Sequence, residues 1–117
     1  MAETVYRIDY VEISVSSTDS AKRFYGEAFG WTFTDYGPAY TEFTDGHMKG
    51  GFDAGSPVKH GGPLVVLYAT DLDTIEKRVT AAGGAISTPT FAFPGGRRFH
   101  FTDPDGNELA VWGPEAA

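Results

Sequence analysis

The order strand–helix–three strands occurs twice in this chain, and it limits the folds that the chain can adopt. Asp19–Gly30 (DSAKRFYGEAFG) and Asp73–Gly84 (DTIEKRVTAAGG) each begin with an aspartate that can cap a helix and end with a glycine that can stop one. The segments lie 54 positions apart, and the same offset pairs the strand at Tyr10 with the strand at Leu64. We therefore predict an α+β fold of two βαβββ modules, with a curved sheet, helices outside and a concave face inside.

Turn residues place the boundaries of the predicted elements. All 117 residues are expected to form one domain, with an N-terminal module at about 6–53, a linker at 54–63 and a C-terminal module at 64–112. The linker holds three glycines and two prolines, which is typical of irregular structure. Residues 89–96 are predicted to be a loop, and residues 89–98 are a candidate lid that carries Phe91 and Phe93. Strands are expected at 6–15, 31–35, 39–44, 47–53, 64–69 and 85–88, and helices at 19–28 and from Asp71 or Asp73 to about 82.

Residues 98–112 are predicted to form a β-hairpin around Asp103-Pro104-Asp105-Gly106. Pro104 presets φ, and Gly106 can take the positive φ that a tight reversal needs. After the turn, Leu109 and Val111 alternate with Ala110 and Trp112, so the last strand has two different faces. If the turn uses four residues, His100 shares the face of Leu109 and Val111.

The composition disfavours several classes of function. The formal net charge is −7 and the pI is near 4.7, whereas proteins that bind nucleic acid or anionic membranes normally carry a basic face. The chain has no cysteine, which removes disulfides, thiolate metal sites and cysteine nucleophiles. Neither a signal peptide nor a membrane-spanning apolar run is recognisable, so we expect a cytoplasmic protein.

Strand alternation predicts which side chains face the concave side. Val11 and Ile13 are expected to face the helix, whereas Tyr10 and Glu12 are expected to face the cleft. A second apolar and aromatic surface needs a ligand or a partner to cover it, although ordinary core packing is the alternative for each residue. The predicted ligand-binding set is Tyr10, Glu12, His47, Phe52, Tyr68, Phe99, Phe101, Ala110 and Trp112.

Two polar members of this set have a functional and a structural interpretation. In an aromatic cleft, the Glu12 carboxylate could orient a ligand amine or act as a general base. Alternatively, it forms a structural ion pair with Arg97, Arg98 or Lys49. His47 either donates to a ligand or is an ordinary turn residue after Asp45-Gly46.

Three motifs resemble the vicinal oxygen chelate superfamily, which includes glyoxalase I, bleomycin-resistance proteins and extradiol dioxygenases. They are Val11–Val15 (VEISV), Ala21–Tyr25 (AKRFY) followed by Phe29-Gly30-Trp31, and Asp103–Asn107 (DPDGN). The resemblance covers about residues 6–112 and concerns the fold more than any activity.

The resemblance implies which positions would bind a metal ion. Metal-dependent members place His and Glu on the first and last strands of each module, and the matching positions here are Tyr10, Leu64, Ala110 and Gly50 or Gly51. These side chains cannot replace a His/Glu set, so no metal and no other cofactor are expected. Because Leu64 occupies one of these positions, it is also included in the predicted ligand-binding set. The resemblance further implies that two copies of the chain form a homodimer.

We therefore expect a glyoxalase/bleomycin-resistance-like protein that binds a small aromatic or apolar ligand in a metal-free concave cleft. One alternative is a metal-dependent lyase, isomerase or dioxygenase that holds a divalent ion with displaced ligands from His47, Glu12, His100 and Glu108. The other is a protein-interaction domain whose cleft buries a partner protein. Whether the chain is an enzyme stays open at this point.

Overall fold

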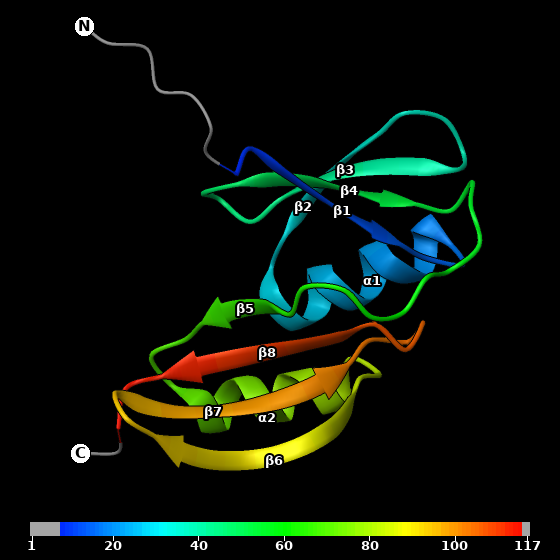
Figure 1. Cartoon of the computed structure of the whole chain (residues 1–117). Coiled ribbons are helices and arrows are strands. Elements are labelled where there is room, and N and C mark those ends of the chain that lie inside the picture. The colour runs from blue at the N-terminus through cyan, green and yellow to red at the C-terminus, as the bar shows by residue number, and fades with distance from the viewer. Residues whose placement is uncertain (1–7, 116–117) are drawn as a thin grey trace, which may run out of the picture.

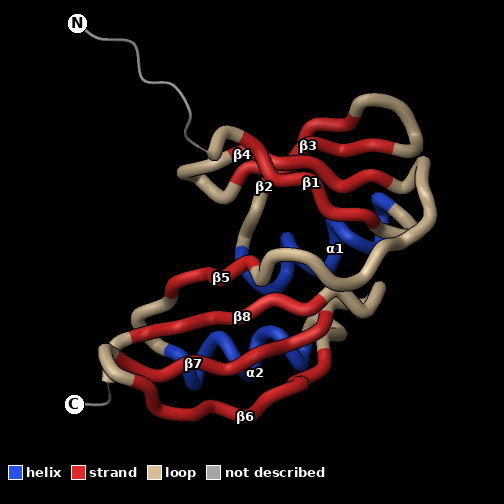
Figure 2. The backbone as a smooth tube through the Cα atoms, viewed as in Figure 1, coloured by secondary structure: helices blue, strands red, loops and turns tan. Residues whose placement is uncertain are grey.

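The computed structural model describes residues 8–115 and contains two βαβββ modules, as the repeat predicts (Figures 1 and 2). The N-terminal module consists of β1 (Tyr10–Ser14), α1 (Thr18–Phe29), β2 (Thr32–Asp35), β3 (Tyr40–Thr44) and β4 (Lys49–Asp53). The C-terminal module consists of β5 (Val65–Tyr68), α2 (Leu72–Ala81), β6 (Ala85–Phe93), β7 (Gly96–Thr102) and β8 (Glu108–Gly113). The predicted first strand included Tyr6 and Arg7, which lie outside the described residues. Among residues 8–115, no helix is both long and apolar enough to span a bilayer.

Each module builds one four-stranded mixed sheet, and the two sheets have the same topology. Their strand orders are β1-β4-β3-β2 and β5-β8-β7-β6, with β1 parallel to β4 and β5 parallel to β8. The edge strands β1 and β5 lie across a gap from each other, and their only ladder partners within residues 8–115 are β4 and β8 (Figure 2). The curved sheet therefore consists of two separate halves.

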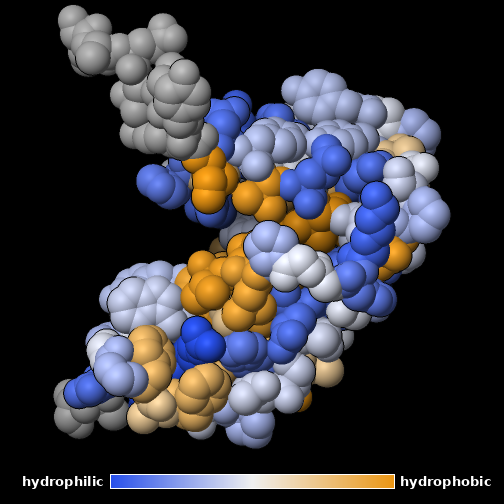
Figure 3. Space-filling model, in the orientation of Figure 1, coloured by the Kyte–Doolittle hydropathy of each residue, from blue (hydrophilic) through white to orange (hydrophobic). Residues whose placement is uncertain are grey.

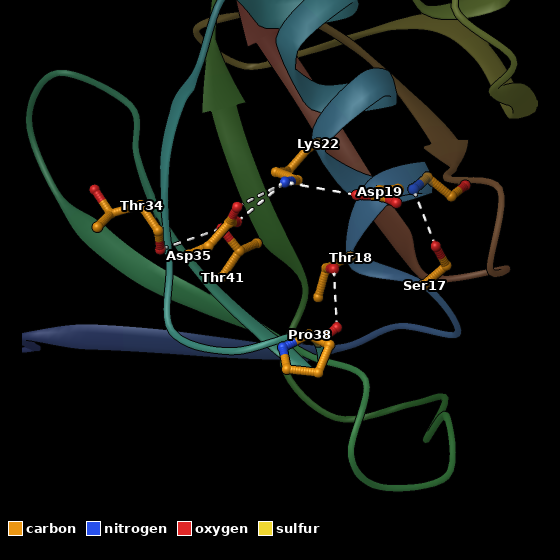
Figure 4. A network of polar contacts seen from close by, with 9 residues as sticks. Ser17, Thr18, Asp19, Lys22, Thr34, Asp35, Pro38 and Thr41 are labelled. Carbon is orange, nitrogen blue, oxygen red and sulfur yellow. Dashed lines mark hydrogen bonds and ion pairs between the residues drawn. The ribbon is translucent and has the colours of Figure 1, made fainter.

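Helix α1 is tied at its N-terminal end to the hairpin of β2 and β3 (Figure 4). Ser17 caps the helix by accepting a hydrogen bond from the Ser20 amide at 3.2 Å. Thr18 Oγ1 donates to the Pro38 carbonyl at 3.3 Å, and Lys22 Nζ donates to Asp35 Oδ1 at 3.0 Å. The hydrogen bond to Asp35 raises the pKa of Lys22 above its ordinary range. These contacts fix the helix against its own sheet.

Both modules share one apolar core, and α1 contacts sheets on both sides of it. The Tyr25 ring stacks on Phe52 of β4 at a centroid distance of 4.8 Å, whereas Phe24 meets Phe101 of β7 at 6.1 Å. The modules are therefore one packing unit. The buried apolar residues are Val15, Ala21, Phe24, Tyr25, Ala28, Phe43, Phe52, Leu72, Val79, Phe99, Phe101, Leu109, Ala110 and Val111.

A buried carboxylate in the β7–β8 turn joins the modules. Asp103 is 5% exposed and accepts hydrogen bonds from Tyr25 Oη at 3.0 Å, the Asn107 amide at 2.9 Å and the Asp105 amide at 3.0 Å. Asn107 Nδ2 donates both to Asp103 at 3.1 Å and to the Ser14 carbonyl of β1 at 2.9 Å. Burial, and secondarily the Asp103 charge, raises the pKa of Tyr25 well above its ordinary value, so its hydroxyl stays a donor.

The prediction of a loop and candidate lid in residues 89–98 is wrong. β6 continues to Phe93, and Phe91 pairs with Arg98 of β7. The β6–β7 register shifts on both sides of Thr88, and Pro89 lies in this irregular part, where a missing amide proton is tolerated. Pro89 and the nearby glycines favour a loop in the sequence. In the structure, the ladder hydrogen bonds between β6 and β7 hold this segment as a strand.

The hairpin turn contains five residues, so the four-residue case considered for His100 does not apply. Thr102 pairs with Glu108, which leaves residues 103–107 in the turn, and Gly106 has the positive φ of 84° that was predicted. The extra residue shifts the pairing by one position. His100 is therefore opposite Ala110 and lies on the face away from the helices, rather than with Leu109 and Val111.

Replacing Asp103 with alanine is expected to lower the free energy of unfolding by about 3 kcal/mol, because it leaves several buried donors without an acceptor. Urea denaturation checks this. Asp105→Ala is the matched control, because its carboxylate makes no hydrogen bond within the described residues. Equal losses in the two variants would contradict the linking role of Asp103.

Candidate functional site

Each sheet has one face packed on the helices and one open face, and some of the predicted site residues lie on these two open faces. Tyr10 and Glu12 lie on the open face of the N-terminal sheet, as predicted. Tyr68, Ala110 and Trp112 lie on the open face of the C-terminal sheet, also as predicted. Leu64 directly precedes β5 and is 38% exposed.

Three predicted members of the ligand-binding set face the helices instead, so their placement in the cleft is wrong. Phe52, Phe99 and Phe101 are fully buried in the core. The ladder registers explain this, because they pair Phe52 with Ile13, Phe99 with Val111 and Phe101 with Leu109. For the last two, the five-residue turn reverses the face that a four-residue turn would give.

A chain of hydroxyl groups ends on Glu12 in the N-terminal module. Tyr40 Oη donates to Glu12 Oε2 at 2.9 Å and lies 2.7 Å from Tyr10 Oη. Since Tyr40 has a single hydroxyl proton, Tyr10 is the donor of the second bond. Desolvation raises the pKa of Tyr40 above its ordinary value near 10, and the hydrogen bonds to Tyr10 and Glu12 add to this. A β-carbon at Gly51 would collide with Tyr40 Oη, so the arrangement requires this glycine.

This arrangement corrects one prediction about Glu12. Its partner within the described residues is a tyrosine, whereas the structural alternative named Arg97, Arg98 or Lys49. Sequence analysis missed Tyr40 as a partner. Gly51 of β4 is the feature that could have indicated this contact. It is paired with Glu12 of β1 and Glu42 of β3, and a glycine at this position leaves space for a tyrosine ring beside Glu12.

An aromatic group covers part of the open face of the C-terminal sheet. The Tyr68 and Trp112 rings meet edge to face at a centroid distance of 4.8 Å, and Phe93 lies 6.3 Å from Trp112. Tyr68 is 56% exposed and Val66 is 43% exposed. A hollow of about 370 Å³ adjoins these rings, and it is lined by Val66, Phe93, Pro94, Gly95, Arg98 and Trp112. We call these six residues and Tyr68 the aromatic face.

Two polar side chains on β7, Arg98 and His100, border the aromatic face. The Arg98 guanidinium lies 5.3 Å from the ring centre of Phe91 and 5.7 Å from that of Phe93. His100 Nδ1 lies 3.1 Å from Glu108 Oε2, and because a carboxylate only accepts, this nitrogen carries the proton. The predicted ligand-binding set did not include Arg98, which was expected at the end of the candidate lid and at the start of the hairpin of residues 98–112.

A second and larger cleft lies between the modules. Its volume is about 530 Å³, and Figure 3 shows apolar side chains on both walls of the hollow. Val11 and Ile13 of β1 form one wall, and Val65 and Leu67 of β5 contribute to the other. The exposed His47, in the β3–β4 turn, also lines this cleft.

The displaced ligands of the metal-dependent alternative do not converge. His100 and Glu108 form a pair on the C-terminal sheet, Glu12 is bound to Tyr40 on the other sheet, and His47 lies in a turn. Residues 8–115 contain no group of three or more His, Cys, Asp or Glu side chains that could hold a metal ion. The donors that this part of the chain presents therefore do not fit such an ion.

Comparison with known proteins identifies relatives of this chain. Residues 7–111 match the family described as "Glyoxalase/Bleomycin resistance protein/Dioxygenase superfamily". The chain is 26% identical over 118 residues to CFP32 from Mycobacterium bovis, in an alignment that covers 89% of this chain and 44% of CFP32. The chain thus spans less than half the length of the curated relatives that it matches.

Solved structures share the fold over most of their length. A glyoxalase-related enzyme from Fulvimarina pelagi has a TM-score of 0.80 and 22% identity, with 93% of this chain and 88% of that chain covered. TnmS3, an antibiotic-binding protein from Streptomyces sp. CB03234, has a TM-score of 0.75 and 22% identity, with 97% and 100% covered. At these identities the likeness concerns the fold.

The raised pKa of Tyr40 predicts how stability depends on alkaline pH. The unfolded tyrosine ionises near pH 10 while the folded one stays neutral, so its stabilising contribution is complete below pH 10 and is lost above it. The stability difference between the natural protein and Tyr40→Phe should therefore shrink between pH 8 and pH 11, by no more than about 1 kcal/mol because the side chain is partly exposed. Urea denaturation at both pH values measures this. Tyr36→Phe, whose hydroxyl makes no hydrogen bond within residues 8–115, should show no such change, and a constant difference for Tyr40→Phe would contradict the prediction.

Proposed function

Because the chain belongs to the Glyoxalase/Bleomycin resistance protein/Dioxygenase superfamily, we propose that it binds a small planar or apolar molecule on the aromatic face of the C-terminal module. The observation that carries the proposal is the pair of exposed Tyr68 and half-buried Trp112, of which Trp112 lines a hollow of about 370 Å³. Exposed aromatic surface gains free energy when a ligand removes it from water. The likeness to the antibiotic-binding protein TnmS3 supports small-molecule binding on this fold.

The aromatic face offers separate roles to its members. Trp112 presents a ring to a planar ligand, and Val66 and Phe93 add apolar contacts at the sides of the hollow. Ala110 lies two residues before Trp112 on the same face of β8 and is paired with His100, and its small side chain keeps the sheet surface low there. We propose that binding uses no metal ion, since the donors in residues 8–115 do not group around one.

The cleft between β1 and β5 is the competing position for a ligand, and its aromatic rings make it the poorer one. Trp31 lines this cleft, but its ring stacks on Tyr25 at 4.8 Å and on Phe43 at 4.7 Å. Its faces are therefore already covered by other rings. Tyr68 and Val66 also line this cleft, whereas Phe93, Arg98 and Trp112 line only the hollow of the aromatic face.

Truncating Trp112 to alanine is expected to raise the dissociation constant of a planar probe about tenfold, because the ring contact is lost. Isothermal titration calorimetry with the neutral probe 2-naphthamide measures this. Tyr36→Ala is the matched control, since Tyr36 is an aromatic residue with 62% exposure in the other module. Equal affinities for Trp112→Ala and the natural protein would contradict the proposed site.

We also propose that two copies of the chain form a homodimer. The supporting observations are the two edge strands, β1 and β5, without further ladder partners within residues 8–115, and the apolar residues beside them. Ile8 is 82% exposed and Leu64 is 38% exposed. Sedimentation equilibrium should give twice the chain mass of 12.6 kDa, and Leu64→Lys should shift the mass towards that of one chain. A single-chain mass for the natural protein at micromolar concentration would contradict the dimer.

A further inference from the structure

Arg98 is a half-buried cation that has no acidic partner within residues 8–115, although the chain as a whole is strongly acidic. The sequence has 16 acidic and 9 basic residues. Within residues 8–115 the ion pairs are Lys22–Asp19, Lys22–Asp35, Lys49–Glu42 and His100–Glu108. None includes Arg98, and its Nε is buried without a hydrogen-bond partner in this part of the chain. Removing a cation from water costs free energy unless an anion or hydrogen-bond acceptors compensate.

Two phenylalanine rings hold the Arg98 guanidinium at the aromatic face. It lies 5.3 Å from the ring centre of Phe91 and 5.7 Å from that of Phe93, which fixes its position through cation–π contacts. The ladder register places Arg98 directly opposite Trp112, and both residues line the 370 Å³ hollow. A positioned guanidinium and an indole ring thus border the same space.

The carboxylate of Glu108, on β8, has hydrogen-bond partners other than Arg98. Glu108 accepts hydrogen bonds from His100 Nδ1 at 3.1 Å and from Ser87 Oγ at 3.3 Å. The Glu108 carboxylate therefore forms hydrogen bonds with His100 and Ser87, and it does not pair with Arg98. His100 lies two residues from Arg98 on the same strand face, and its Nε2 is a second buried nitrogen without a partner within residues 8–115.

We propose that the ligand of the aromatic face is a planar aromatic anion, such as an arenecarboxylate, whose negative group pairs with Arg98 while its ring lies against Trp112. This inference rests on the proposed function and adds the chemical class of the ligand to it. A guanidinium matches a carboxylate through two parallel hydrogen bonds, which supplies both affinity and orientation.

Calorimetric titration with 2-naphthoate and 2-naphthamide tests the inference, because these two probes share their ring system and differ in charge. The natural protein should bind 2-naphthoate at least about tenfold more tightly than 2-naphthamide. Arg98→Met keeps an unbranched apolar stem, and should bring the affinity for 2-naphthoate down to that for 2-naphthamide while changing the latter less than about twofold. Arg98→Lys should retain part of the preference, because it retains the charge.

Arg97→Met is the matched control. Arg97 is the adjacent residue of β7, its Nε is also buried without a partner within residues 8–115, and strand alternation places it on the opposite face. This variant should keep the preference for 2-naphthoate. Circular dichroism and the melting temperature of each variant report whether it is folded.

The outcomes separate the inference from the proposed function. Equal affinities of the natural protein for the two probes, with a loss in Trp112→Ala, would overturn the anionic ligand and leave the aromatic face as the site. A folded Arg98→Met variant that still prefers 2-naphthoate would overturn the role of Arg98. Failure of both probes to bind would overturn the proposed function and the inference together.

Discussion

The hydrogen bonds of buried Asp103 hold the two modules in one arrangement, and the rest of the structure depends on them. The carboxylate accepts from Tyr25 of α1 and from the backbone of its own turn, and Asn107 carries the connection to the Ser14 carbonyl. A charged group at 5% exposure is tolerated only because several donors satisfy it. One turn thus organises the hairpin of β7 and β8, the position of α1 and the end of β1.

This connection determines where ligands can approach. The shared core fills the space around the helices, whereas β1 and β5 remain apart and leave an apolar cleft between them. The open faces of the two sheets differ in chemistry. The N-terminal face carries a hydroxyl chain that ends on Glu12. The C-terminal face carries aromatic rings and the Arg98 guanidinium, which has no ion-pair partner among residues 8–115. This asymmetry between two modules of equal topology is the reason for assigning the ligand to the C-terminal face.

Much of the fold could be predicted from the sequence, because local signals and the repeat agree. Asp71 caps the second helix, Gly106 takes a positive φ, and both modules have the predicted order of one strand, one helix and three strands. The errors arose where a single residue of register decides the face of a side chain. The hairpin turn contains residues 103–107, so Phe99 and Phe101 enter the core and His100 leaves it. Strand pairing likewise extends β6 through Pro89 to Phe93. Arg98 of β7 is paired with Phe91 of this extended strand, so it lies at the aromatic face. Contacts between distant residues, such as Tyr40 with Glu12, have no local signal in the sequence.

The central claim is that a ligand binds the aromatic face and not the cleft between the modules. A titration of the ¹⁵N-labelled protein with 2-naphthoate, followed by ¹H–¹⁵N correlation spectra, tests it most directly, since Arg98 of β7 lines only the hollow of the aromatic face and β1 lines only the cleft. The account predicts that the largest chemical-shift changes occur at the amides of Arg98 on β7 and Trp112 on β8. Changes concentrated at Val11 and Ile13 of β1, which line the cleft, would contradict it.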